Sequence, residues 1–243
     1  RFAQDGWEVC ITDRDGEKLP EVYRALSEGN HLVCPGDYTK AETINQLTRQ
    51  IAVSWGGLDA LVNCAGVFMS ADAVTSPLEN WRKPLDIMIG GALNLTRLCV
   101  PLMQGAGRII HITSIHSERA ERDSSAYAMA KAAIGQYCRG LAVELADQGI
   151  LVNAVAPGFI NTPMGVENGI NIVDSAWFKS SYVEGHHLPL RRAGYPEEVA
   201  GVALFLAGAD ASYLTGQVIP VDGGLTISFS GSQPNRPSRA FWF

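Results

Sequence analysis

The chain has 243 residues, of which 47% are hydrophobic, so it is long enough to bury one sizeable core. Its net charge of −6 argues against nucleic acid or an anionic membrane as the main partner, because both are bound through clustered lysines and arginines. The five cysteines are an odd number and are widely spaced, which predicts buried free thiols and neither a disulfide framework nor a metal site. No segment approaches the ~20 continuous apolar residues of a membrane span. These features predict a cytoplasmic protein.

The first half of the chain alternates strands with helices. After a helix end at Gly6, strands are expected over residues 7–12, 31–34 and 58–63. An amphipathic helix is expected over residues 40–54. The following stretch to Gln104 is helical in composition, with a bend near Gly90. Strands that alternate with helices predict an α/β fold, a Rossmann-like doubly wound parallel sheet in a single domain.

The second half places a reactive trio at the carboxyl end of a strand. Residues 107–112 form a buried strand that leads to Ser114, and an alanine-rich helix then carries Tyr127 and Lys131. Positions four residues apart lie on one face of a helix, so an ammonium group stands beside the phenol. Because open α/β sheets bind ligands at the carboxyl ends of their strands, we expect Ser114, Tyr127 and Lys131 to form a proton-transfer site. A single Tyr-x-x-x-Lys pair is also ordinary helix surface, so the strand-end serine decides the interpretation.

The rest of the chain predicts a lid, a last strand and a tail. Residues about 160–192 have no clean period and carry several aromatic and histidine side chains, which is typical of a mobile lid over the substrate. The alternative is that these aromatics pack a subunit contact. A helix from Pro196 and a strand from Gly216 complete a domain over residues 1–227. Residues 228–243 form a C-terminal tail that ends in an aromatic triplet; this tail either covers a partner's lid or is disordered.

Five ordered motifs carry a resemblance to a known family. They are Asp37-Tyr38-Thr39, Asn63-Cys64-Ala65-Gly66, Ser114 with Tyr127-x-x-x-Lys131, Pro157-Gly158 through Thr162-x-Met164, and Thr215-Gly216 through Asp222-Gly223-Gly224. With these motifs at these spacings, nearly the whole chain resembles a classical short-chain dehydrogenase/reductase.

The resemblance implies roles for individual residues. Tyr127 would be the general acid/base, Lys131 would lower its pKa and hold the nicotinamide ribose, and Ser114 would bind the substrate oxygen. Cofactor-binding roles are implied for Tyr127, Lys131 and the following residues: Asp13, Asp37, Tyr38, Asn63, Ala65, Gly66, Pro157, Gly158, Ile160 and Thr162. His116, two residues beyond Ser114, is a candidate substrate ligand; a loop histidine without a chemical role is the alternative.

Asp13 bears on the choice of cofactor. It follows the strand at residues 7–12, where an acidic side chain accepts hydrogen bonds from the adenosine ribose and repels a 2′-phosphate. This favours NAD, with NADP the less favoured cofactor. The competing interpretation is a turn aspartate, because Arg14-Asp15-Gly16 follows it.

Two departures from the family pattern stand out. The glycine-rich turn after the family's first strand is not present in these residues, so we expect that about 15 to 20 residues, one strand and its turn, lie ahead of Arg1. Met88 stands where the family has an asparagine that supports a proton relay. A thioether does not replace the hydrogen bonds of an amide, so the relay would be rebuilt through Asn94 or His116, or turnover would be slow.

The expected function is NAD-dependent interconversion of a secondary alcohol and its carbonyl. A sugar, polyol or cyclic alcohol is the candidate substrate, because the lid is rich in aromatic and histidine side chains. One alternative is a 3-ketoacyl-thioester reductase, and an alternative of another class is a catalytically silent NAD-binding sensor or scaffold. The resemblance also implies a homotetramer that uses the Tyr127 helix and its neighbour, with the last strand region as a second contact. No metal site is expected.

Overall fold

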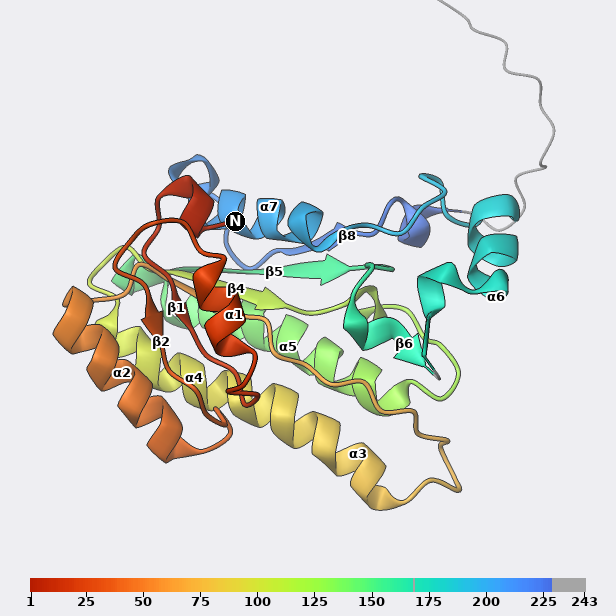
Figure 1. The fold of residues 1–243 in the computed structure, drawn as a ribbon, viewed down its shortest axis with the longest axis horizontal. Coiled ribbons are helices and arrows are strands. Elements are labelled where there is room, and N and C mark those ends of the chain that lie inside the picture. Colours follow the sequence, from red (N-terminus) through yellow and green to blue (C-terminus); the bar gives the residue numbers. More distant parts are fainter. Residues whose placement is uncertain (168, 229–243) are drawn as a thin grey trace, which may run out of the picture.

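A computed structural model describes residues 1–167 and 169–228 (Figure 1). Its centre is a parallel sheet in the order β3-β4-β5-β8. These strands are β3 (Ala60–Asn63), β4 (Arg108–Ile112), β5 (Leu151–Pro157) and β8 (Val218–Val221). The middle residues of β4 and β5 are buried without alternation, because helices cover both faces of the sheet. The expected doubly wound α/β fold is therefore confirmed.

Two short strands form a separate parallel pair. β1 (Cys10–Ile11) pairs with β2 (Leu32–Val33), and helix α1 (Leu19–Arg24) lies between them in the chain. In the described part of the chain, β1 and β3 share no ladder, and residues near both strands, among them Cys10 and Leu61, line one cavity.

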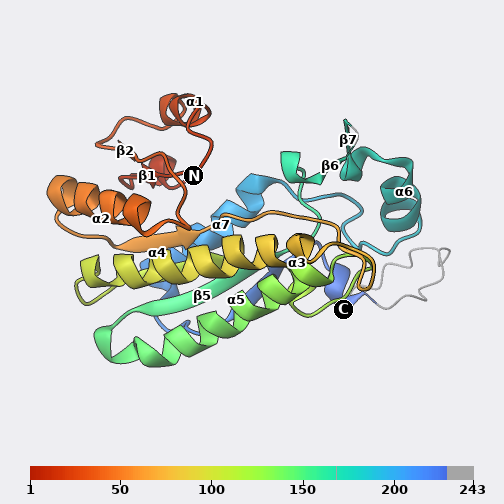
Figure 2. The same cartoon turned by 90° about the horizontal axis from the view of Figure 1, so that it is seen from below.

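Helices pack on both faces of the sheet. α2 (Ala41–Trp55), α4 (Gly91–Cys99) and α5 (Ser125–Glu144) lie on one face, and α7 (Pro196–Ala207) lies on the other (Figures 1 and 2). The first face holds the larger core cluster, which includes Ile44, Leu47 and Ile51 of α2, as the apolar stripe predicts. Side chains of α7 such as Leu206 pack against Ile110 and Val155.

The long helical run before β4 changes its winding near Gly90, as expected. α3 (Leu78–Leu85) leads through a π-helical turn at Asp86–Gly90 directly into α4, and Pro84 lies inside α3 without ending it. A side chain at Gly91 would collide with the ring of Tyr38, so this glycine permits close packing. The run Leu78–Leu102 has the length and composition of a membrane-crossing helix, a property that it shares with core helices of soluble proteins, and α3 packs against α5.

The segment expected to be a lid contains more regular structure than its sequence suggests. A short hairpin of β6 (Val166–Glu167) and β7 (Ile170–Asn171) is followed by α6 (Ala176–Phe178) and a π-helical turn at Lys179–Glu184. Phe178 is buried and stacks on Tyr182, with ring centroids 5.5 Å apart. The aromatic side chains thus build a small core of their own, which a sequence period does not reveal. Of the C-terminal tail, only Ser228 belongs to the described residues.

Candidate active site

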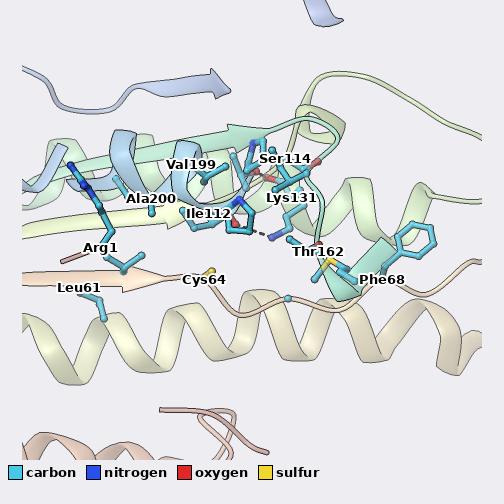
Figure 3. A pocket seen from close by; sticks show the side chains of 18 of the residues that line it. Arg1, Leu61, Cys64, Phe68, Ile112, Ser114, Lys131, Thr162, Val199 and Ala200 are labelled. Carbon is cyan, nitrogen blue, oxygen red and sulfur yellow. Dashed lines mark hydrogen bonds between the residues drawn. The ribbon is translucent and has the colours of Figure 1, made fainter. Parts of the chain in front are cut away.

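A cavity of about 930 Å³ opens at the carboxyl ends of the strands (Figure 3). Ser114, His116, Tyr127 and Lys131 all line it. Ser114 follows β4, and the other two members of the expected trio lie on the first turns of α5. Parallel strands bring their carboxyl ends to one edge, so residues that are distant in sequence meet here.

The phenol of Tyr127 sits among three neighbours. The hydroxyl of Ser114 lies close enough to the phenol to lower its pKa. The ring of Phe68 packs edge-on with centroids 5.5 Å apart, and the ring of His116 does so at 5.7 Å. The two rings fix the position of the phenol beside the Ser114 hydroxyl.

Lys131 is almost completely buried and is held by the end of β4. Its Nζ donates to the carbonyl oxygen of Ile112 at 2.8 Å, drawn as a dashed line in Figure 3. The hydroxyl of Thr113 donates to the carbonyl oxygen of Lys131 at 2.7 Å, which ties the helix to the strand. Thr113 was not among the expected site residues, although its position beside Ser114 is the signal that points to it.

The pKa values differ from the sequence-based expectation. Burial raises the pKa of Tyr127, and the hydrogen bond from Ser114 opposes that change. Burial also lowers the pKa of Lys131 to about 8. Nζ of Lys131 lies 5.6 Å from the centroid of the Tyr127 ring and points to Ile112, so the side chains of the protein do not by themselves give the lowered phenol pKa that was expected.

The implied cofactor residues fall into three groups. Gly66, Pro157, Gly158, Ile160 and Thr162 line the large cavity together with Tyr127 and Lys131. Tyr38, Asn63 and Ala65 line a neighbouring cavity of about 100 Å³. Asp13 and Asp37 line neither cavity.

Both aspartates are engaged in local turns. Asp13 is exposed and its Oδ1 accepts from the backbone N–H of Asp15 at 2.7 Å, which is the turn arrangement that competed with a ribose-binding role. Oδ1 of Asp37 accepts from the backbone N–H and the hydroxyl of Thr39, and these bonds lower the pKa of Asp37. Each carboxylate retains a second oxygen for a ligand.

A buried polar network supports Asn63, and no motif in the sequence points to it. The amide nitrogen of Asn63 lies 3.2 Å from Nδ1 of His111 and donates to the hydroxyl of Thr96 at 3.3 Å. Burial, and then the charge of Lys131, lower the pKa of His111 to about 4, so its imidazole is neutral and Nδ1 accepts the amide hydrogen. His111 is directly opposite Asn63 in the ladder of β3 and β4, a register that the sequence does not show.

Met88 occupies the π-helical turn and is buried against Ala130 and Ile134. It lines the smaller cavity, whereas Asn94 lines neither cavity. Asn94 and His116 were the two candidates for a rebuilt relay. His116 packs against the Tyr127 ring, with centroids 5.7 Å apart, so it is the better placed of the two.

Comparisons with known proteins identify the class of this arrangement. A family profile described as "Enoyl-(Acyl carrier protein) reductase" matches residues 1–226. The 3-oxoacyl-(acyl-carrier-protein) reductase FabG of Thermotoga maritima is 35% identical over 93% of this chain and 90% of its own length. Glucose 1-dehydrogenase of Gluconobacter oxydans is 34% identical over 93% of this chain and 85% of its own length.

Solved structures that resemble this chain are also dehydrogenases or reductases. A gluconate 5-dehydrogenase from Burkholderia cenocepacia, in complex with NADP and tartrate, superposes with a TM-score of 0.83 at 28% identity and covers 93% of this chain and 88% of its own. A short-chain dehydrogenase/reductase of unknown function from Caenorhabditis elegans, with cofactor, has a TM-score of 0.84 at 31% identity and covers 97% and 91%. The fold and these relatives define an NAD(P)-dependent oxidoreductase that acts on an alcohol or carbonyl group. The chain belongs to the short-chain dehydrogenase/reductase family.

The residues at the carboxyl edge fit a nicotinamide cofactor. Gly66 leaves the backbone open beside Lys131, since an added Cβ would lie 3.4 Å from Nζ. Gly158 permits a close approach to Asp222, where a Cβ would meet the aspartate at 2.8 Å. A buried ammonium group, a hydroxyl at Thr162 and open backbone at Gly66 are the donors that ribose and carboxamide groups require.

Proposed function

We propose that this protein interconverts a secondary alcohol and its carbonyl with NAD, and that Tyr127 is the general acid/base. The observation that carries the proposal is the contact of the Tyr127 phenol with the Ser114 hydroxyl, one helical turn from Lys131, in one cavity. A trio of this kind fits an oxidoreductase better than a silent sensor, because binding a dinucleotide does not require a half-buried phenol beside a serine.

The bound nicotinamide would supply the hydride acceptor or donor. Oxidation removes a hydride from the carbinol carbon and a proton from its hydroxyl, and Tyr127 would take that proton at its phenol oxygen. Ser114 would donate a hydrogen bond to the substrate oxygen and hold it beside Tyr127. Lys131 would hold the nicotinamide ribose, and its charge would favour the phenolate once the ammonium turns toward the phenol. Gly66, Pro157, Gly158, Ile160 and Thr162 would bind the cofactor along the cavity, and Tyr38, Asn63 and Ala65 its adenosine side.

The walls of the cavity favour a cyclic alcohol as substrate. Phe68, Phe159 and Val173 are apolar, and His116 and Glu121 add polar groups on one side. Rings with both apolar faces and hydroxyl groups suit such walls. Two of the relatives are named for glucose and gluconate, which accords with a sugar, polyol or cyclic alcohol. Reduction of a 3-ketoacyl thioester is the second candidate, because a reductase of that name is 35% identical.

Turnover of an alcohol panel tests the proposed function. The purified protein is assayed at the reduced-nicotinamide absorbance with NAD or NADP against sugars, polyols, cyclic alcohols and a 3-hydroxyacyl thioester. We expect NAD-dependent oxidation of a cyclic or polyhydroxylated alcohol. Turnover of the thioester alone would move the assignment to the second candidate. Tight NAD binding without turnover of any compound would favour the silent sensor.

The cofactor preference predicts a consequence for Asp13. The second oxygen of its carboxylate would accept from the adenosine ribose and repel a 2′-phosphate, so NAD is the expected cofactor. Asp13→Ser is expected to lower kcat/KM for NAD about tenfold and to raise it for NADP. Steady-state kinetics with both cofactors measure this change, with the exposed Asp5→Ser as the control. A preference of the wild type for NADP would contradict the assignment.

The outer helices predict an assembly. Exposed apolar side chains include Leu93 on α4 and Val143 on α5, and such surface on neighbouring helices favours burial against other copies. We expect a homotetramer of the 26.1 kDa chain, measured by light scattering in solution. Leu93→Glu with Val143→Glu should lower the mass, whereas Val53→Glu on α2 should not. A monomeric wild type would refute this expectation.

Three further parts of the proposal concern location, the lid and the tail. We infer a cytoplasmic protein from the five cysteines, all of which are free.

We also propose that the segment 160–192 covers the substrate. Deletion of residues 228–243 without loss of assembly or activity would show that the tail does not cover a partner's lid.

A further inference from the structure

One carboxylate stands close to the proposed reaction centre and has no assigned role. Glu121 lies in the loop before α5 and lines the same cavity as Ser114 and Tyr127. Its side chain is 43% exposed, so one part is packed against the protein and the other faces the cavity. A carboxylate at this position bears directly on which substrates fit.

His116 connects Glu121 to the reaction centre. The backbone N–H of His116 donates to the Oγ of Ser114 at 3.2 Å, and the His116 ring packs edge-on against the Tyr127 ring. Its Nε2 lies 3.3 Å from Oε2 of Glu121. The backbone of His116 is therefore tied to Ser114, and its imidazole contacts both the Tyr127 ring and the Glu121 carboxylate.

The charge of Glu121 is maintained by this contact. The hydrogen bond from His116 lowers the pKa of Glu121, so the group is ionised at neutral pH. Two cationic side chains of the cavity wall have other partners. Nζ of Lys131 donates to the carbonyl oxygen of Ile112, and Arg122, whose side chain is 92% exposed, pairs with Asp123 at 3.8 Å. In the segment 160–192, burial and then the charge of Glu121 raise the pKa of Tyr182.

We propose that Glu121, oriented by His116, accepts a hydrogen bond from a second hydroxyl of the substrate, so that the preferred substrate is an uncharged cyclic diol or polyol. An ionised carboxylate only accepts hydrogen bonds, so its partner must be a donor. A substrate that carries a carboxylate or phosphate near the reacting carbon meets a like charge and is disfavoured. Phe68 and Phe159 line the same cavity and would offer apolar rings to the carbon skeleton. This inference rests on the proposed alcohol oxidation and assigns the site its substrate class.

Matched alcohols that differ by one hydroxyl test the assignment. Cyclohexanol, 1,2-cyclohexanediol and 1,3-cyclohexanediol are compared with wild type, Glu121→Leu and Glu121→Gln. We expect kcat/KM of the wild type for the better diol to exceed that for cyclohexanol about tenfold. Glu121→Leu should reduce this ratio to about one, mainly through KM for the diol, with cyclohexanol little changed. Glu121→Gln should keep part of the ratio, because an amide oxygen still accepts.

Glu118→Leu is the matched control. Glu118 lies three residues earlier in the same loop region, is 69% exposed and faces Arg139 at 4.0 Å. It does not line the cavity. Its replacement should leave the diol ratio as in the wild type, and equal loss in both leucine variants would show a general effect of loop charge and overturn the proposal.

The outcomes separate this inference from the proposed function. Equal kcat/KM for diol and cyclohexanol in the wild type, or a ratio unchanged in Glu121→Leu, overturns the role of Glu121 while alcohol oxidation stands. If none of the three alcohols is oxidised, calorimetric titration of the same alcohols into the protein with NAD decides the binding preference. Tighter binding of a diol that is lost in Glu121→Leu supports the role of Glu121, and equal binding overturns it.

Discussion

Tyr127→Phe is expected to lower kcat/KM about 10³-fold, because the variant keeps the aromatic ring and loses only the group that moves the proton. The ring would still pack against Phe68 and His116, whose centroids lie 5.5 and 5.7 Å away, so the cavity wall is preserved. Steady-state kinetics with the best alcohol of the panel measure the loss.

The control for this variant is Tyr137→Phe on the same helix. Tyr137 lies near Thr96 and His111 and lines neither cavity, so its replacement should change kcat/KM by less than about threefold. Binding of NAD, followed by protein fluorescence, is expected to stay within a few-fold in both variants. Activity above one tenth of the wild type in Tyr127→Phe would remove the phenol from the mechanism.

The grouping of Ser114, Tyr127 and Lys131 in one cavity could be predicted from the sequence because each member follows a local rule. Tyr127 and Lys131 are four residues apart in a helix, and Ser114 follows a strand whose unbroken apolar run is typical of a parallel sheet. The family motifs then assign chemistry to these positions. The same rules predicted the bend near Gly90, which the structure builds as a π-helical turn.

The rest of the site depends on tertiary contacts that no local rule contains. His111 is opposite Asn63 only because β3 and β4 pair in one register, and Glu121 reaches Tyr127 only through the His116 ring. Tyr38 lines the smaller cavity, and its ring also packs over Gly91, a contact that no sequence pattern shows. The hydrogen bond from Nζ of Lys131 to Ile112 could not be predicted either, because helical spacing fixes the position of the Lys131 Cα but not that of its ammonium group.

Lys131→Met is expected to abolish measurable alcohol oxidation while preserving the stability of the fold at pH 7. Burial lowers the pKa of Lys131 from 10.5 to about 8, which means that the folded protein holds this proton less tightly than the unfolded chain. The charged form therefore destabilises the fold fully below pH 8, by about 3 kcal/mol, and this penalty is relieved as the pH rises from about 8 to 10.5. Methionine removes the penalty, and it also leaves the carbonyl of Ile112 without its partner, which costs about 1 to 3 kcal/mol.

The pH dependence of unfolding distinguishes this account from a purely structural role for Lys131. The wild type, relative to Lys131→Met, should gain stability between pH 8 and 10.5, with a slope of at most about 1.4 kcal/mol per pH unit. Urea unfolding at several pH values measures the difference, with Lys18→Met as control because Lys18 is 78% exposed and paired with Asp15. Parallel curves for wild type and Lys131→Met would show that Lys131 keeps its ordinary pKa. Since a lysine retained for stability alone would be replaced with a loss of stability at pH 7, a stable but inactive variant identifies the buried ammonium as a group kept for catalysis.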